Sequence, residues 1–264
     1  MKHLIIKNIL VLLLGIFVFT NVAYADYSGT YQSYINLYDT YRQAERSYVT
    51  SKNKYLTYQT LTAEQEALDN GKNFLKLRDQ LVILYLKLLY DRVNESGGYT
   101  TDERNLIFNK LNVEMNWLTE HRTKYDSSST LKDLQRLSDQ MQDRYLSLIR
   151  YIGLQTAGGI LQNKLSVMTV LLQDLLNQTE AQLARVDESG KDTTVSQRWL
   201  LEAKNKLSLA IEKQEDSRQI FASLHGQNLI TDYNQGAFYL SESNQYLREA
   251  NFYLSEIIRL TKGE

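Results

Sequence analysis

The sequence predicts an all-α fold, an elongated antiparallel helical bundle with coiled-coil-like packing that follows an N-terminal signal peptide. Three observations lead to this prediction. Tyrosines recur every seventh residue near both ends of the chain, proline is absent from all 264 residues, and apolar residues recur at helical spacing over most of the length between. Because seven residues make two turns of helix, each tyrosine series forms a continuous stripe along one side of its helix.

The absence of proline favours long helices with short connections. Average usage would place about a dozen prolines in a chain of this length. Proline breaks helix interiors and is common in turns and at sheet edges. A codon bias toward Lys, Asn, Ile and Tyr also lowers proline usage, but it rarely removes the residue altogether. We therefore expect about five to seven helices, connected by few and short loops.

Residues 1–25 have the three parts of a secretory signal peptide: a basic start, an apolar run at 9–19 and a small-x-small cleavage site that ends at Ala25. The mature chain then begins at Asp26. The apolar run is shorter than the roughly 20 residues that a membrane-spanning helix needs, so we favour cleavage over an uncleaved anchor. The chain has no cysteine, which excludes a lipid-modified leader and any disulfide. We expect a secreted or extracytoplasmic protein with no transmembrane helix in the mature chain.

Residues 26–264 are expected to form a single helical domain. Helical periodicity predicts helices at about 27–60, 64–94, 102–125, within 131–186, 195–224 and 231–261. Three residue pairs have the spacing of a helix-starting capping box, namely Thr62 with Gln65, Thr100 with Glu103, and Thr130 with Asp133. Whether the helix breaks near Thr60 is open. The pair Gly158-Gly159 predicts a turn or a bend, because glycine destabilises a helix interior.

One internal similarity suggests a duplicated helix-loop-helix, with loops near 95–101 and 188–194. Residues 92–101 and 185–194 are identical at seven of ten positions, at a constant offset of 93. Both segments lie where one predicted helix ends and the next begins. Outside them the two copies diverge, so a capping solution reached twice independently is the alternative to duplication.

The composition and motifs give no support for an enzyme or a cofactor. The chain carries 30 basic and 31 acidic residues, so it lacks the concentrated basic surface that nucleic-acid binding requires. Phosphate-binding, nucleophile-elbow and zinc-binding motifs are absent from the sequence. We expect His121 to be solvated. The acidic loop 187–192 suits calcium only in part, because Lys191 interrupts it and later ligands are missing. We therefore predict no catalytic, cofactor or metal site.

The N-terminal tyrosines are the remaining candidates for function. The candidate interaction stripe comprises Tyr27, Tyr31, Tyr34, Tyr38, Tyr41, Tyr48 and Tyr55. Such rings most often line the seam between helices, but they also serve as partner-binding surfaces or stack on sugar rings. At the other end, Tyr239, Tyr246 and Tyr253 flank an aliphatic line of their own. We expect the two terminal helices to lie side by side with their rings interleaved.

The segments 55–62 (YLTYQTLT) and 240–251 (LSESNQYLREAN), with the helices between them, resemble uncharacterised secreted helical, coiled-coil-like proteins of candidate-phyla bacteria. This resemblance implies an exported helical fold and no particular activity. We expect a non-enzymatic scaffold or protein-interaction module of the bacterial cell envelope or surface, which binds a protein partner or itself through its helical faces. The alternatives are a protein that binds a glycan or an apolar ligand in a tyrosine-lined groove, and a membrane-active bundle.

Overall fold

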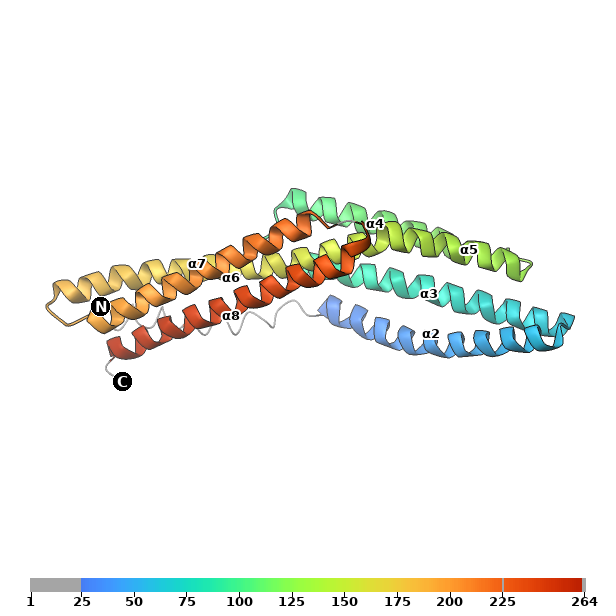
Figure 1. Ribbon diagram of the computed structural model, residues 1–264, viewed down its shortest axis with the longest axis horizontal. Coiled ribbons are helices and arrows are strands. Elements are labelled where there is room, and N and C mark those ends of the chain that lie inside the picture. The colour runs from blue at the N-terminus through green and yellow to red at the C-terminus, as the bar shows by residue number, and fades with distance from the viewer. Residues whose placement is uncertain (1–24, 225, 263–264) are drawn as a thin grey trace. The chain divides into compact units, whose positions relative to one another are not determined.

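A computed structural model describes residues 25–224 and 226–262, and within these ranges the chain is an all-α helical bundle without strands (Figure 1). The elements are α2 (Ala25–Tyr58), α3 (Leu61–Glu95), α4 (Thr101–Lys124), α5 (Leu131–Arg144), a π-helical turn η1 (Tyr145–Ile149), α6 (Arg150–Glu188), α7 (Thr194–Ala222), a 3-10 turn η2 (Gly226–Asn228) and α8 (Leu229–Lys262). The predicted fold class is confirmed. The predicted signal peptide lies outside the described residues up to position 24, and the predicted cleavage pair, Ala25 and Asp26, opens α2.

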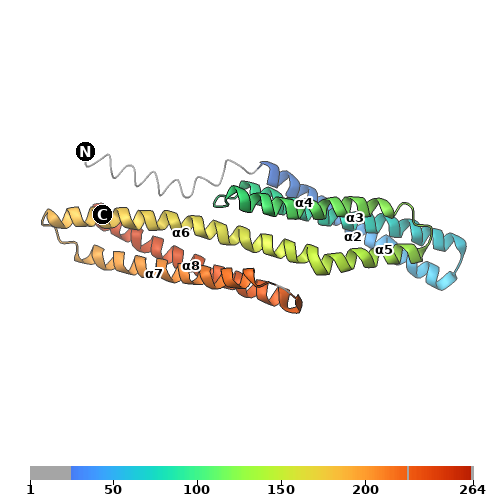
Figure 2. The same cartoon turned by 90° about the horizontal axis from the view of Figure 1, so that it is seen from above.

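The chain divides into two compact units, which are described separately. The first contains the residues up to Glu95 and Asn112–Asp139, and the second contains Ser96–Leu111 and Gln140–Glu264. α2 and α3 pack along each other in the first unit, and α6, α7 and α8 pack together in the second (Figures 1 and 2). The two terminal helices therefore find their main neighbours in separate units. The single domain of residues 26–264 and the interleaving of the two tyrosine series stay predictions.

α2 and α3 form a helical hairpin with a tight turn. The chain turns at Gln59, whose φ of 51° is in the left-handed region. Thr60 then starts α3, because its Oγ1 accepts a hydrogen bond from the backbone N–H of Ala63 at 3.2 Å. The helix thus breaks at the position that the sequence left open. The predicted capping residue, Thr62, is wrong: it lies two positions further along, inside α3.

The face of α2 that contacts α3 combines tyrosines with small residues. Small side chains recur between the tyrosines on this line, and Thr30, Ala44 and Ser51 are buried. The rings of Tyr41 and Tyr48 stack on Phe74 of α3, with centroids 5.3 and 5.6 Å apart. The small residues let the two helices approach closely, while the rings cover the edge of the contact. We call Tyr27, Tyr34, Tyr41, Tyr48 and Tyr55 the seam stripe; all five are half-buried.

Two of the three predicted capping boxes are present. The backbone N–H of Glu103 donates to Thr100 Oγ1 at 3.2 Å, and the carboxylate of Glu103 accepts from the Thr100 N–H at 2.9 Å. At the start of α5, the N–H of Asp133 donates to Thr130 Oγ1 at 3.1 Å, and the Thr130 hydroxyl donates to the Asp133 carboxylate. These hydrogen bonds satisfy backbone donors that the first turn of a helix leaves free.

The second unit is built on the aliphatic line of α8. Residues at alternating spacings of three and four, namely Leu240, Ser243, Leu247, Ala250, Leu254 and Ile257, are all buried. Leucines of α6 and α7 complete the core. The partly buried Tyr246 and Tyr253 pack at its edge, as the sequence predicted for the C-terminal tyrosines.

Of the two alternatives predicted for Gly158 and Gly159, a turn or a bend, the turn is wrong, because α6 continues through both residues. A Cβ on Gly158 would lie 2.9 Å from the ring carbons of Phe221, and one on Gly236 would lie 2.7 Å from the same ring. The two glycines therefore make room for Phe221 between α6 and α8. The long predicted helical run 131–186 is interrupted instead by the π-helical turn at Tyr145–Ile149.

The two similar loops agree in their boundaries but differ in their geometry. α3 ends at Glu95 and α6 at Glu188, and the next helices begin at Thr101 and Thr194, which preserves the offset of the sequence match. The glycines with positive φ, Gly98 and Gly190, are not at equivalent positions. The Thr193 hydroxyl also donates to Asp187 at 2.7 Å rather than capping its own helix. Duplication stays a hypothesis.

Candidate functional site

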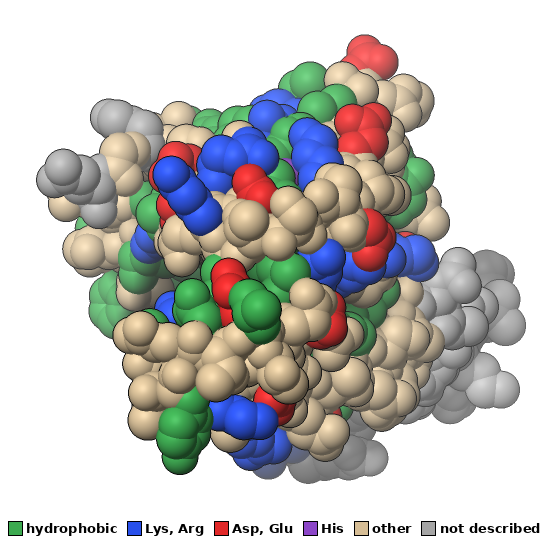
Figure 3. Space-filling view, turned by 90° about the vertical axis from the view of Figure 1, so that its right-hand side faces the viewer, with side chains coloured by type: hydrophobic (Ala, Val, Ile, Leu, Met, Phe, Trp, Pro, Cys, Tyr) green, Lys and Arg blue, Asp and Glu red, His purple; other side chains and the backbone are tan. Residues whose placement is uncertain are grey.

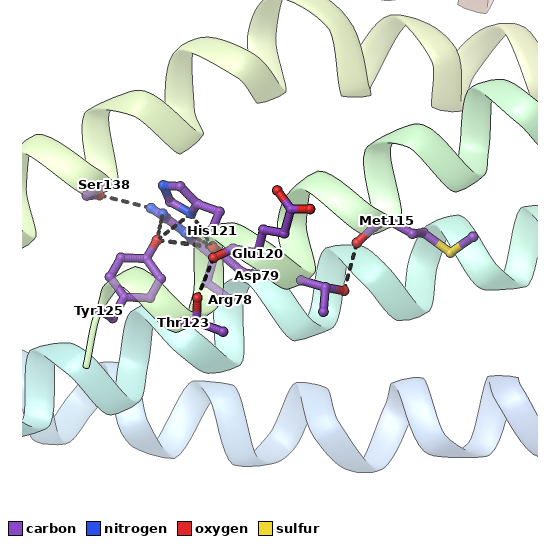
Figure 4. A network of polar contacts seen from close by, with 9 residues as sticks. Arg78, Asp79, Met115, Glu120, His121, Thr123, Tyr125 and Ser138 are labelled. Carbon is purple, nitrogen blue, oxygen red and sulfur yellow. Dashed lines mark hydrogen bonds and ion pairs between the residues drawn. The ribbon is translucent and has the colours of Figure 1, made fainter. Parts of the chain in front are cut away.

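The first unit contains a buried cluster of polar side chains, formed by Arg78, Asp79, His121, Tyr125 and Ser138 (Figure 4). Asp79 lies on α3 four residues after the buried Leu75, in the register of the core. On α4 and just beyond it, buried residues recur at alternating spacings of three and four: Leu111, Glu114, Leu118, His121 and Tyr125. Helical periodicity therefore brings the carboxylate, the imidazole and the phenol to one place.

Asp79 is the centre of the buried cluster. Its Oδ2 lies 2.7 Å from Nδ1 of His121 and accepts a hydrogen bond from the Tyr125 hydroxyl at 3.1 Å. Arg78 donates through Nε to Asp79 Oδ1 at 3.3 Å, and its terminal nitrogens donate to Tyr125 and to Ser138 on α5. The cluster thus connects α3 to α4 through the carboxylate of Asp79, and α3 to α5 through the guanidinium of Arg78.

The centre of the cluster is closed to solvent, whereas Arg78 and Ser138 at its edge are half-buried. Asp79 and Tyr125 have no exposed surface, and His121 is 1% exposed. Burial, and secondarily the charge of Asp79, raises the pKa of Tyr125. The indole of Trp117 stacks on the imidazole, with ring centroids 4.7 Å apart. The expectation that His121 is solvated is wrong. Because the carboxylate, the imidazole and the phenol are all buried, this arrangement is suited to fixing the register of three helices rather than to binding a ligand.

In the acidic loop 187–192, two of the three carboxylates accept hydrogen bonds from residues at the start of α7. Asp187 accepts a hydrogen bond from the Thr193 hydroxyl, and Asp192 accepts one from the backbone N–H of Thr194 at 2.9 Å. This second contact lowers the pKa of Asp192. Over residues 25–224 and 226–262, no group of three or more acidic or histidine side chains is placed to hold a metal ion.

The predicted interaction stripe of α2 is divided between two faces. Tyr27, Tyr34, Tyr41, Tyr48 and Tyr55 make up the seam stripe on α3, whereas Tyr31 and Tyr38 are 47% and 39% exposed. These two belong to a second line at alternating spacings of four and three, which we call the flank stripe: Tyr31, Ile35, Tyr38, Arg42, Glu45, Val49, Lys52 and Leu56. Each of its members directly follows a residue of the contact with α3, so the flank stripe lies about 100° around the helix from it.

The flank stripe collects the exposed apolar side chains of α2. Its apolar members, Tyr31, Ile35, Tyr38, Val49 and Leu56, are 37–59% exposed, and the other large apolar residue exposed on α2 is Tyr58 at the helix end. The remaining solvent-facing lines of α2 carry Ser, Thr, Asn, Gln, Gly and charged residues. The sequence indicated Ile35, Val49 and Leu56 as apolar neighbours of the tyrosines, but we did not assign them with Tyr31 and Tyr38 to a line of their own. Their spacing from Tyr31 and Tyr38 contains that information.

Charged and aromatic groups contact each other within the flank stripe. The guanidinium of Arg42 lies 3.8 Å from the carboxylate of Glu45 and donates a hydrogen bond to the Tyr38 hydroxyl at 3.3 Å. The ammonium of Lys52 lies 5.8 Å from the ring centroid of Tyr48, which belongs to the neighbouring seam stripe. On the face of the molecule drawn in Figure 3, basic, acidic and hydrophobic side chains are interspersed. The flank stripe is thus an exposed apolar line with a pair of opposite charges near its middle.

Comparison of the chain with protein-family models, with curated proteins and with solved structures finds no match. In the described ranges, none of the helices combines the length and the apolar character that a membrane span requires.

Proposed function

We propose that the chain is an exported, non-enzymatic interaction module of the cell envelope or surface, and that it contacts a protein partner through the flank stripe of α2. The signal-peptide pattern of residues 1–25 supports export. The observation that carries the proposal is that five of the exposed large apolar side chains of α2 lie on one line. Exposed apolar residues scattered singly need no explanation, but their concentration on one face of a helix is typical of an interface.

The chemistry of the flank stripe favours a helical protein surface as the ligand. Residues at alternating spacings of three and four lie on one face of a helix, and such a face packs into a groove on a helical partner. Tyrosine and arginine, which are enriched where interfaces are energetically important, occur together at Tyr38 and Arg42. The seam stripe leaves the flank stripe free for this role, because the hairpin contact uses the former.

Site-specific photo-cross-linking tests this proposal. A benzophenone amino acid replaces Tyr38 or Val49 on the flank stripe, and it replaces Thr40 or Ser47 on an exposed polar line of α2 as matched controls. In cells that export the protein, we expect protein adducts from positions 38 and 49 and few from positions 40 and 47. Equal yields at all four positions would contradict the proposal. Adducts that a glycosidase removes and a protease does not would support the glycan-binding alternative instead.

A further inference from the structure

We propose that the partner of the flank stripe is the flank stripe of a second copy of this chain, packed antiparallel about a two-fold axis between Arg42 and Glu45. This inference rests on the proposed function and names the partner. The flank stripe is self-complementary when it is reversed. In this arrangement Tyr31 faces the partner's Leu56, Ile35 faces the partner's Lys52, and Tyr38 faces the partner's Val49. A two-fold interface uses the same surface on both copies, so each of these contacts occurs twice.

The charges of the flank stripe select this orientation. Antiparallel packing about the proposed axis brings Arg42 opposite the partner's Glu45, and Glu45 opposite the partner's Arg42. Each copy already holds these two side chains 3.8 Å apart, with 53% and 43% of their surface exposed, so the pairs would join into one cluster of alternating charges. Charges that pair across helices set the orientation of coiled-coil partners.

A second charged pair next to the flank stripe reinforces the same orientation. Asp39 and Arg46 are exposed and directly follow Tyr38 and Glu45. In an antiparallel pair such following positions face each other, which brings Asp39 near the partner's Arg46 on both sides of the axis. A parallel pair in register would instead oppose Arg42 to Arg42, Glu45 to Glu45 and Lys52 to Lys52. Like charges at facing positions disfavour that alternative.

The length and the character of the flank stripe fit a reversible dimer. From Tyr31 to Leu56 it extends about 38 Å, at the rise of 1.5 Å per residue of an α-helix. Lys52 faces Ile35 across the interface, and its long aliphatic stem covers apolar surface while its ammonium group reaches water. Five apolar positions supply the burial, and the three charged positions supply the specificity.

Charge reversal and its restoration test the contact by sedimentation equilibrium of the purified protein. We expect a monomer–dimer equilibrium for the natural sequence. Arg42→Glu and Glu45→Arg, made singly, should each weaken the dimer at least tenfold, and the double reversal should restore it. Arg218→Glu is the matched control, because Arg218 and Glu215 form an exposed pair of the same spacing on α7, and it should change nothing. Circular dichroism checks that every variant keeps its helices.

Disulfide trapping tests the orientation, and the absence of native cysteine removes any background. We expect Tyr38→Cys and Val49→Cys to form few disulfide dimers when each is oxidised alone, and to link to each other when they are mixed. Disulfides within either variant alone would overturn the antiparallel arrangement.

A natural sequence that stays monomeric at the concentrations reached in the envelope would overturn the inference. If position 38 then still captures a different protein by photo-cross-linking, the proposed function stands without self-association. If the flank positions capture no protein at all, the proposed function fails as well.

Discussion

Nδ1 of His121 lies 2.7 Å from Oδ2 of Asp79, and both side chains are buried. Each residue stands at a core position of its helix, so helical spacing alone brings them into contact. The carboxylate also accepts from Tyr125 and from Arg78, and Arg78 in turn donates to Ser138 on α5. A polar group so placed stabilises the fold only as long as all its partners remain.

Replacement of Asp79 should therefore destabilise the protein strongly. Asp79→Ala leaves the hydrogen-bonding groups of His121, Tyr125 and Arg78 without their acceptor inside the protein. We expect the free energy of unfolding to fall by about 3 kcal/mol, as is usual when buried polar groups lose a shared partner. Denaturant titration measures this change. Asp69→Ala, at an exposed position of the same helix, should change stability by less than about 0.5 kcal/mol.

Replacement of the glycines beside Phe221 by alanine should destabilise the protein, whereas the same replacement at an open helix position should stabilise it. At Gly158 or Gly236 an added Cβ would approach the Phe221 ring to 2.9 or 2.7 Å. We expect each substitution to destabilise the protein by about 1–3 kcal/mol, because the core is overpacked. Gly29→Ala in α2 is the control: a Cβ there meets nothing within 4 Å, and it should stabilise by about 0.5–1 kcal/mol. A stabilising Gly158→Ala, measured by thermal unfolding, would contradict the described packing.

The start of α3 distinguishes the observed cap from the predicted one. Thr60→Ala removes the acceptor for the Ala63 N–H and should cost about 1 kcal/mol. Thr62→Ala keeps that contact and should be nearly neutral. If chemical denaturation ranked the two variants the other way, the predicted capping box at Thr62 would be correct.

Alkaline pH should weaken the fold through buried tyrosines. Burial raises the pKa of Tyr99 to about 12 and also raises the pKa of Tyr125. Tyrosines of the unfolded chain lose their proton at about pH 10. Above that pH the unfolded chain therefore binds fewer protons than the folded chain. The free energy of unfolding should therefore fall as the pH rises from about 10 to about 12. Tyr99→Phe should flatten this slope, which denaturant titration at a series of pH values measures.

The sequence predicted the fold class and the α8 core because local periodicity carries both. The seven-residue spacing of the tyrosines also placed them correctly on a continuous face. Expectations based on the residue type alone were wrong where the contacting residue is distant in sequence. His121 was expected to be solvated because its neighbours in sequence are charged. It lies instead on the buried face of α4 and contacts Asp79, 42 positions earlier. The pair Gly158-Gly159 predicted a turn or a bend, because nothing near it in sequence indicates that Phe221 packs against Gly158.

The division of α2 into two faces was also within reach of the sequence. Two of the seven tyrosines in the candidate stripe, Tyr31 and Tyr38, were assigned to it by residue type alone. Spacing separates Tyr31 and Tyr38 from the seam stripe and joins them to Ile35, Val49 and Leu56. The burial of the seam stripe depends on α3, in particular on Phe74, and this contact is not visible in the sequence of α2 alone.

The most direct test of these separate roles is thermal unfolding of Tyr41→Ser and Tyr38→Ser as a function of protein concentration. Self-association raises the unfolding midpoint with concentration. Tyr41→Ser should unfold at a lower temperature at every concentration but keep the concentration dependence, because Tyr41 packs on Phe74. Tyr38→Ser should match the natural sequence in dilute solution and lose the dependence. A concentration dependence lost on replacing Tyr41 but kept on replacing Tyr38 would contradict the account.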